Sequence, residues 1–104
     1  AKPTPGSDPS WFGFPITLKE NAGVKRLDLV RYLDQFKIGS RLLFAGNLTN
    51  QPYFEGVEYR ISGELKNTDL VMNNTLWLGV QPTLDKEHYD FVASKLEEFF
   101  GVNF

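Results

Sequence analysis

The sequence predicts a small α+β domain in which helices pack on one face of a short sheet. The chain of 104 residues is long enough for one domain with a modest core, and 41% of its residues are hydrophobic. Two segments repeat apolar residues at three- and four-residue steps, which is typical of amphipathic helices. Short apolar runs beside them predict strands, so strands and helices alternate along the chain.

The first half of the chain is expected to form a strand, a helix and a second strand. Residues 11–18 (WFGFPITL) form the first strand, and Pro15 places it at a sheet edge because proline cannot donate a ladder hydrogen bond. Residues 26–37 form the helix. Its predicted buried stripe is Leu29, Val30, Leu33 and Phe36. Residues 40–44 form the second strand, which the apolar run Leu42-Leu43-Phe44 predicts to be buried.

The second half is expected to contain, in order, an extended edge at 53–61, a short helix at 67–73, a strand at 75–80 and a helix at 86–100. Asp85 is expected to cap the last helix, because its carboxylate can accept hydrogen bonds from free amides of the first turn. Gly101 is expected to end that helix. The predicted buried stripe of the helix is Tyr89, Val92, Leu96 and Phe99.

The composition argues against several classes of function. The formal net charge is −2 and the longest positive run is Lys25-Arg26, so we expect no nucleic-acid partner. No apolar stretch approaches the length of a membrane span, so we expect no membrane partner. The chain has no cysteine, which removes disulfides and thiolate metal ligands and fits a cytoplasmic protein.

The beginning of the chain resembles a linker. Residues 1–10 are rich in proline, glycine and serine, the chain starts with Ala1, and its single methionine is Met72. We therefore expect a linker remnant at 1–10 and one domain at 11–104, taken from a longer protein.

The residues do not make a complete catalytic site. His88 is the only histidine, and at the start of the last helix we expect it to be exposed or to take part in capping. The serines have no plausible histidine partner that could activate a nucleophile. We therefore assign neither a catalytic residue nor a metal ligand to this chain.

The segment 41–54 (RLLFAGNLTNQPYF) is the first candidate for ligand contact. Asn47, Asn50 and Gln51 offer amides that suit sugar and base edges, and Arg41 offers paired donors that suit a phosphate. The same amides are ordinary turn residues, which is the more common explanation of such a loop. Arg41 could instead form a surface ion pair, with Asp34 or Glu64 as the partner.

The aromatic cluster of the first strand is the second candidate. Strand alternation puts Phe12 and Phe14 on one face and Trp11 on the other. The more common role of such phenylalanines is to fill the core. The functional alternative is a hydrophobic wall that faces a ring system.

Most of the chain resembles a known family. The resemblance is carried by the segments SDPSWFGFPITLKE, RLLFAGNLTNQPYF and YRISGELKNTDLVMNNTLWLGVQPTL, and by the closing helix. Together they resemble the carboxy-terminal domain of sugar 3-dehydrases in the DegT/StrS sugar aminotransferase superfamily. Within it, the likeness is to the branch that acts on CDP-4-keto-6-deoxy-D-glucose in lipopolysaccharide biosynthesis, and RLLFAGNLTNQP is the segment most specific to the dehydrases.

The resemblance implies the small domain of an aspartate-aminotransferase-type fold, with an amino-terminal cofactor domain missing from this chain. The intact enzyme would use pyridoxamine 5′-phosphate, the amino form of pyridoxal 5′-phosphate, and a two-iron two-sulfur cluster held by cysteines of the missing domain. It would act on a CDP-linked 4-keto-6-deoxyhexose, receive electrons from a reductase partner and form a homodimer. Its products would be 3,6-dideoxyhexoses of the O-antigen, and the present chain alone would be inactive.

One position departs from the pattern of the related aminotransferases. Where they typically show Y-H-L-F-P, this chain has WFGFP, so Phe12 stands at the position of their histidine. A phenyl ring can neither donate a hydrogen bond nor exchange a proton. The resemblance therefore implies that Phe12 lines the cofactor–sugar pocket and disfavours transamination. The alternatives are the equivalent domain of a sugar aminotransferase and a stand-alone ligand-binding module of ferredoxin-like form.

Overall fold

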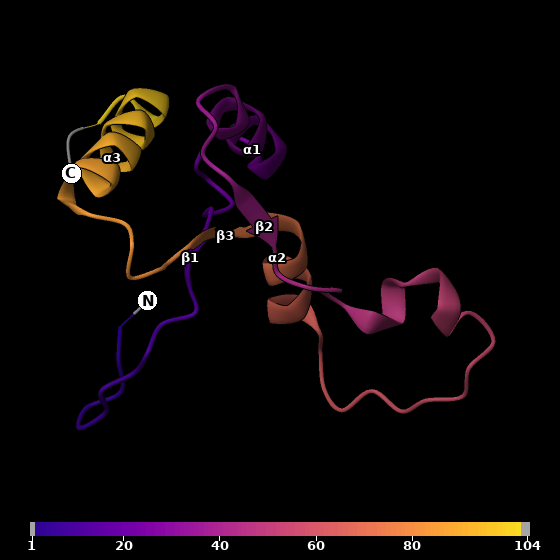
Figure 1. Cartoon of the computed structure of the whole chain (residues 1–104). Coiled ribbons are helices and arrows are strands. Elements are labelled where there is room, and N and C mark those ends of the chain that lie inside the picture. Colours follow the sequence, from indigo (N-terminus) through magenta and orange to yellow (C-terminus); the bar gives the residue numbers. More distant parts are fainter. Residues whose placement is uncertain (1, 103–104) are drawn as a thin grey trace.

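The structure, a computed structural model, describes residues 2–102. Its elements are β1 (Gly13–Thr17), α1 (Arg26–Gln35), β2 (Ser40–Leu42), the 3-10 turns η1 (Leu48–Asn50) and η2 (Pro52–Phe54), α2 (Lys66–Asn74), β3 (Thr75–Gly79) and α3 (Lys86–Phe100) (Figure 1). The expected helices and strands are therefore confirmed to within two residues at each end, apart from the extended edge predicted at 53–61.

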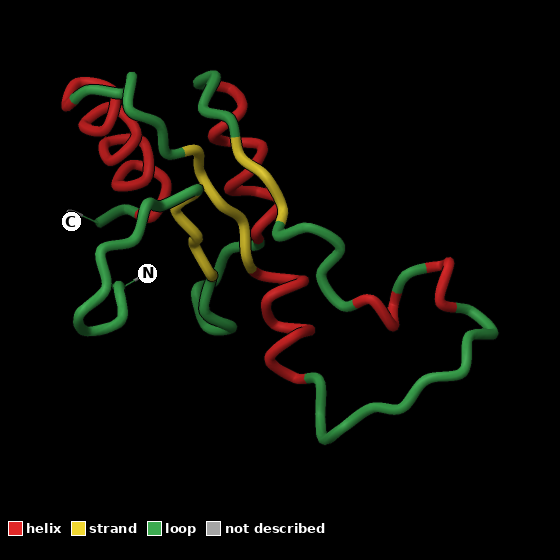
Figure 2. The backbone as a smooth tube through the Cα atoms, turned by 60° about the horizontal axis from the view of Figure 1, so that its bottom comes forward, coloured by secondary structure: helices red, strands yellow, loops and turns green. Residues whose placement is uncertain are grey.

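The three strands form one antiparallel sheet in the order β1-β3-β2. β1 is an edge strand, as Pro15 predicted. Phe14 pairs with Leu78 and Ile16 pairs with Leu76, so these four side chains share one face of the sheet. Helices α1 and α3 lie on that side of the sheet (Figures 1 and 2). The predicted arrangement, with helices on one face, is confirmed for this pair.

The core lies between this face of the sheet and α1. Its buried residues are Leu18, Leu29, Leu33, Leu76 and Leu78. Two of the four residues in the predicted stripe of α1, Leu29 and Leu33, are thus fully buried, because their four-residue spacing places both on the side of the helix that faces the sheet. Helix α3 packs against the core through Val92, Leu96, Phe99 and Phe100, and all four remain partly exposed.

The prediction of a buried strand at 40–44 was wrong beyond Leu42. The backbone of Phe44 adopts a positive φ of 49°, and its amide donates to the Leu42 carbonyl over 2.8 Å, so the chain turns out of the sheet. Leu42 is 51% exposed and Phe44 is 81% exposed. An apolar run is buried only where another element covers it, and no element of the described structure covers this one.

Residues 43–65, which we call the projecting arm, extend away from the sheet in both views (Figures 1 and 2). The radius of gyration is 16.3 Å, compared with about 13 Å for a compact chain of 100 residues. The extended edge predicted at 53–61 was wrong, because η2 and a loop occupy these residues. Ring contacts of Phe54 with Tyr53 and Tyr59 organise this part of the arm.

Candidate functional site

The face of the sheet that the helices leave uncovered carries an aromatic pair. Trp77 pairs with Pro15 and Arg41 across the sheet, so it lies on the face opposite Leu76 and Leu78. Its indole Nε1 donates to the Leu42 carbonyl oxygen over 3.1 Å. The Phe12 ring lies 4.7 Å from the Trp77 ring, centroid to centroid, at an angle of 38°. This face therefore offers a phenyl ring supported by a fixed indole.

The positions of Phe12 and Phe14 correct the sequence-based prediction. Phe12 packs on Trp77, whereas Phe14 lies on the helix-covered face. Strict alternation fails because β1 starts at Gly13 and the chain bends at Phe12. Neither ring fills the core of this chain, since Phe12 is 72% exposed and Phe14 is 51% exposed.

Arg41 lies on the same uncovered face, opposite Trp77 in the sheet register. Its guanidinium donates to the neighbouring Ser40 carbonyl over 3.1 Å. Within residues 2–102 it forms no ion pair, so the alternative of a surface pair with Asp34 or Glu64 is wrong; Glu64 pairs with Lys66 instead. An exposed guanidinium without a carboxylate partner can accept an anion such as a phosphate.

Most hydrogen bonds of the side-chain amides in the loop 47–51 stabilise the loop itself. Asn47 is only 3% exposed, and its Nδ2 donates to Asp69 on α2 over 2.7 Å. Its Oδ1 accepts from the Thr49 amide (3.0 Å) and hydroxyl (2.8 Å), which makes it the cap of η1. Asn47 thus ties the base of the projecting arm to α2, and its main polar groups are already engaged. For this residue the turn explanation holds.

Asn50 and Gln51 are less engaged than Asn47. Asn50 is exposed, and its side chain makes a long hydrogen bond of 3.4 Å to Asp69. Gln51 donates from Nε2 to the Ala45 carbonyl over 2.6 Å, and its Oε1 accepts no hydrogen bond from the residues described here. No hydrogen bond connects these two amides with Arg41. The structure therefore brings Phe12 and Arg41 to one face and leaves Asn50 and Gln51 on a separate, anchored loop.

His88 and Lys95, both on α3, each contact a neighbouring carboxylate. His88 is exposed, with its Nδ1 2.6 Å from the Asp85 carboxylate, which confirms its expected position at a capped helix start. Lys95 bonds to Glu98 over 2.7 Å, and this bond raises the pKa of Lys95, whereas a Schiff-base lysine needs a lowered one. In the part of the chain that the structure describes, no three histidine, cysteine or carboxylate groups could hold a metal ion together.

These residues fit the two implied cofactors unequally. The sequence has no cysteine, so an iron–sulfur cluster does not fit this chain. The exposed Phe12 ring can form one wall of a pyridoxal phosphate pocket. Among residues 2–102, no helix is long and apolar enough to cross a membrane.

The sequence alone did not identify Trp77 or Asp69 as residues that support the candidate site. Trp77 supports Phe12, and Asp69 holds Asn47. A signal for Trp77 was present, because it alternates with Leu76 and Leu78 and so had to occupy the other face of its strand. Asp69 carries no such signal, because its pairing with Asn47 spans 22 positions of the chain.

The fold and this site define the chain as a small α+β domain of the aminotransferase fold. It belongs to the DegT/DnrJ/EryC1/StrS aminotransferase family, whose model matches residues 1–97. It is 65% identical to the lipopolysaccharide biosynthesis protein RfbH of Salmonella typhimurium over 97% of this chain and 23% of that protein. It is also 49% identical to a dTDP-4-dehydro-2,6-dideoxy-D-glucose 3-dehydratase of Saccharopolyspora spinosa, over 92% of this chain and 21% of that enzyme.

Solved structures show the same fold. A GDP-4-keto-6-deoxymannose-3-dehydratase with bound GDP-perosamine superimposes with a TM-score of 0.73 at 26% identity, over 81% of this chain and 22% of that one. The Escherichia coli GDP-4-keto-6-deoxy-D-mannose-3-dehydratase with bound hydrated PLP gives the same score, identity and coverage. The chain thus spans about a fifth of the length of the relatives it matches.

Proposed function

We propose that this chain is the carboxy-terminal small domain of a nucleotide-sugar 3-dehydratase that uses pyridoxamine phosphate. The observation that supports this most strongly is its 49% identity to a named sugar 3-dehydratase over nearly the whole chain. The identity to RfbH supports lipopolysaccharide biosynthesis as the setting. The proposed substrate is CDP-4-keto-6-deoxy-D-glucose, and the proposed products are 3,6-dideoxyhexoses of the O-antigen.

In this proposal the reactive groups lie outside these 104 residues. The rest of the protein anchors the cofactor and holds a two-iron two-sulfur cluster, a reductase supplies electrons, and two copies of the intact protein form a homodimer in the cytoplasm. When bound, pyridoxamine phosphate supplies the electron sink that allows the sugar C3 hydroxyl to leave. The present chain contributes shape and polar contacts, so we expect it to be inactive alone.

Phe12 and Arg41 are the proposed contacts on the uncovered sheet face. The Phe12 ring is exposed and packs against the Trp77 ring. It can therefore line the cofactor–sugar pocket in the position that it already occupies. Arg41 has no carboxylate partner and can bind a phosphate of the nucleotide. Asn50 and Gln51 are proposed to contact the sugar or base, while Asn47 acts by fixing their loop.

The related activity to exclude is sugar amino transfer. Phe12 cannot exchange a proton, unlike the histidine typical of the aminotransferases. The test is to incubate the intact protein with the keto-sugar, pyridoxamine phosphate and a reductase, and to analyse the products by mass spectrometry. A product that has lost the C3 hydroxyl supports the proposal, and Phe12→His should shift part of the product towards a C4 amine. A wild-type protein that yields only the amine would make it an aminotransferase.

A further inference from the structure

Helix α2 contacts the loop of Asn50 and Gln51 through one carboxylate oxygen. Oδ1 of Asp69 accepts a hydrogen bond from Nδ2 of Asn47 over 2.7 Å and a longer one from Nδ2 of Asn50 over 3.4 Å. Asn47 is almost completely buried, and Asp69 is half-buried. The carboxylate therefore joins the anchor of the loop to one of its two proposed ligand contacts.

Three residues further along α2, Met72 contacts the start of the same loop. Its Sδ accepts a hydrogen bond from the Asn47 amide over 3.3 Å. The preceding Gly46 packs closely on this side chain, because a Cβ built there would lie 2.5 Å from Cγ of Met72. Residues three positions apart lie on the same side of a helix. Asp69 and Met72 therefore give the loop two attachment points on one side of α2.

Helix α2 is in turn fixed to the packed part of the domain. The guanidinium of Arg26, at the start of α1, donates to the carbonyl oxygen of Met72 and, over 3.3 Å, to that of Thr75. Thr75 is buried and begins β3, the central strand of the sheet. The position of Asp69 is therefore set by α1 and the sheet, and the loop takes its place from there.

We propose that Asp69 is a positioning residue for the nucleotide-sugar site. By holding Asn47 and Asn50 it fixes the place of the loop amides that contact the sugar or base, and it touches neither sugar nor cofactor itself. This inference rests on the proposed function. Because both hydrogen bonds end on Oδ1, the carbonyl oxygen of an asparagine can accept both, whereas an alanine accepts neither. The role thus requires an acceptor at this place and does not require its charge.

The test compares three variants of the intact protein by steady-state kinetics with CDP-4-keto-6-deoxy-D-glucose. Asp69→Ala should raise KM about fivefold or more, because the loop is no longer held in its binding position, while kcat changes by less than about twofold. Asp69→Asn should return KM to near the wild-type value. Asn67→Ala is the control, because Asn67 is exposed and lies roughly 200° around α2 from Asp69.

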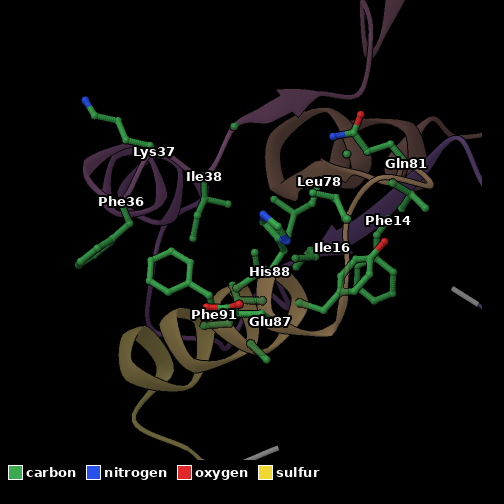
Figure 3. A pocket seen from close by; sticks show the side chains of 18 of the residues that line it. Phe14, Ile16, Phe36, Lys37, Ile38, Leu78, Gln81, Glu87, His88 and Phe91 are labelled. Carbon is green, nitrogen blue, oxygen red and sulfur yellow. The ribbon is translucent and has the colours of Figure 1, made fainter.

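Amide hydrogen exchange of the same variants without sugar reports on the loop independently of turnover. Asp69→Ala should speed exchange in residues 47–51, and neither Asp69→Asn nor Asn67→Ala should do so. Helix α3 borders an apolar groove on the helix-covered side of the sheet (Figure 3), and Asp69 does not line that groove. Exchange along α3 should therefore be the same in all variants and serves as the internal reference.

Two results would overturn the inference. One is that Asp69→Ala speeds exchange in the loop but leaves KM unchanged, since the position of the loop would then not matter to the substrate. The other is that Asp69→Asn raises KM as much as Asp69→Ala, since the charge of Asp69 would then act directly. A wild-type protein that does not turn over the sugar contradicts the proposed function instead. The exchange contrast between the alanine and asparagine variants would still decide whether Asp69 holds the loop.

Discussion

The indole of Trp77 occupies the space that a side chain at position 13 would need. A Cβ built on Gly13 would lie 2.1 Å from Cε3 of Trp77, well inside any permitted contact. Gly13 therefore lets the indole lie flat across the edge strand, where Phe12 covers it. The aromatic pair on the uncovered face depends on this missing side chain.

Gly13→Ala should therefore destabilise the domain by about 1–3 kcal/mol, the usual cost of overpacking. Urea unfolding of residues 1–104 measures the change. Gly79→Ala is the matched control, because Gly79 pairs directly with Gly13 and a Cβ there would meet nothing within 4 Å. If both variants unfold at the same urea concentration, Trp77 does not occupy the position described.

Asn47→Ala should also destabilise the domain, by about 1–3 kcal/mol, because it removes the hydrogen bonds that the buried Asn47 side chain makes with partly buried partners. These partners are the amide and hydroxyl of Thr49 and the carboxylate of Asp69, all of which are partly buried. Asn50→Ala, at an exposed amide of the same loop, should stay within about 0.5 kcal/mol of the wild type. Equal unfolding free energies for the two variants would remove Asn47 as the anchor of the projecting arm.

Arg41→Ala in the intact protein should raise KM for the nucleotide sugar about tenfold or more, because a charge-assisted contact with phosphate is lost. The turnover number should change little, since the guanidinium does not touch the reacting carbons in this proposal. Steady-state kinetics separate the two constants. Arg31→Ala, an exposed arginine on α1, is the control. Kinetics that Arg41→Ala leaves unaltered would take Arg41 out of the site.

The cap of α3 should make stability depend on pH in acid. The hydrogen bonds from His88 to the Asp85 carboxylate, led by the one from its side chain, lower the pKa of Asp85 below its ordinary value of 3.8. A lowered pKa in the fold means that the stabilisation is present above about pH 3.8 and is lost as the pH falls through the folded pKa.

We therefore expect the melting temperature of the wild type to fall more steeply than that of Asp85→Asn between pH 5 and about pH 2. Asparagine can still cap the helix, but it does not titrate. The other carboxylates that titrate in this range contribute equally to the melting temperatures of the two proteins, so their effect cancels in the comparison. If the melting temperatures of the two proteins fall equally with pH across the whole range, the Asp85 carboxylate contributes nothing to the cap.

Local patterns were enough to predict the helices and their ends. The spacing of Leu29 and Leu33 fixed the buried side of α1, and Asp85 and Gly101 mark the observed ends of α3. Pro15 correctly placed its strand at an edge. Each of these features depends on residues within a few positions of one another, so a single segment carries the whole signal.

Features that depend on distant contacts could not be predicted in this way. The apolar character of Phe44 suggested burial, but burial depends on which element covers the strand, and the chain turns away at that residue. The face of the sheet on which the Phe12 ring lies depends on where β1 begins, which the sequence pattern did not show. The uncovered sheet face became evident only once Trp77 was paired with Arg41 across the sheet.

The central claim is that the uncovered sheet face and the anchored loop form one wall of a nucleotide-sugar site. Hydrogen exchange of the intact protein, measured with and without CDP-4-keto-6-deoxy-D-glucose, tests it most directly. The account predicts slower exchange in 11–14 and 40–51 when the sugar is bound, with α3 unchanged because it lies on the opposite face. Protection confined to other parts of the protein, with both segments unaffected, would contradict it.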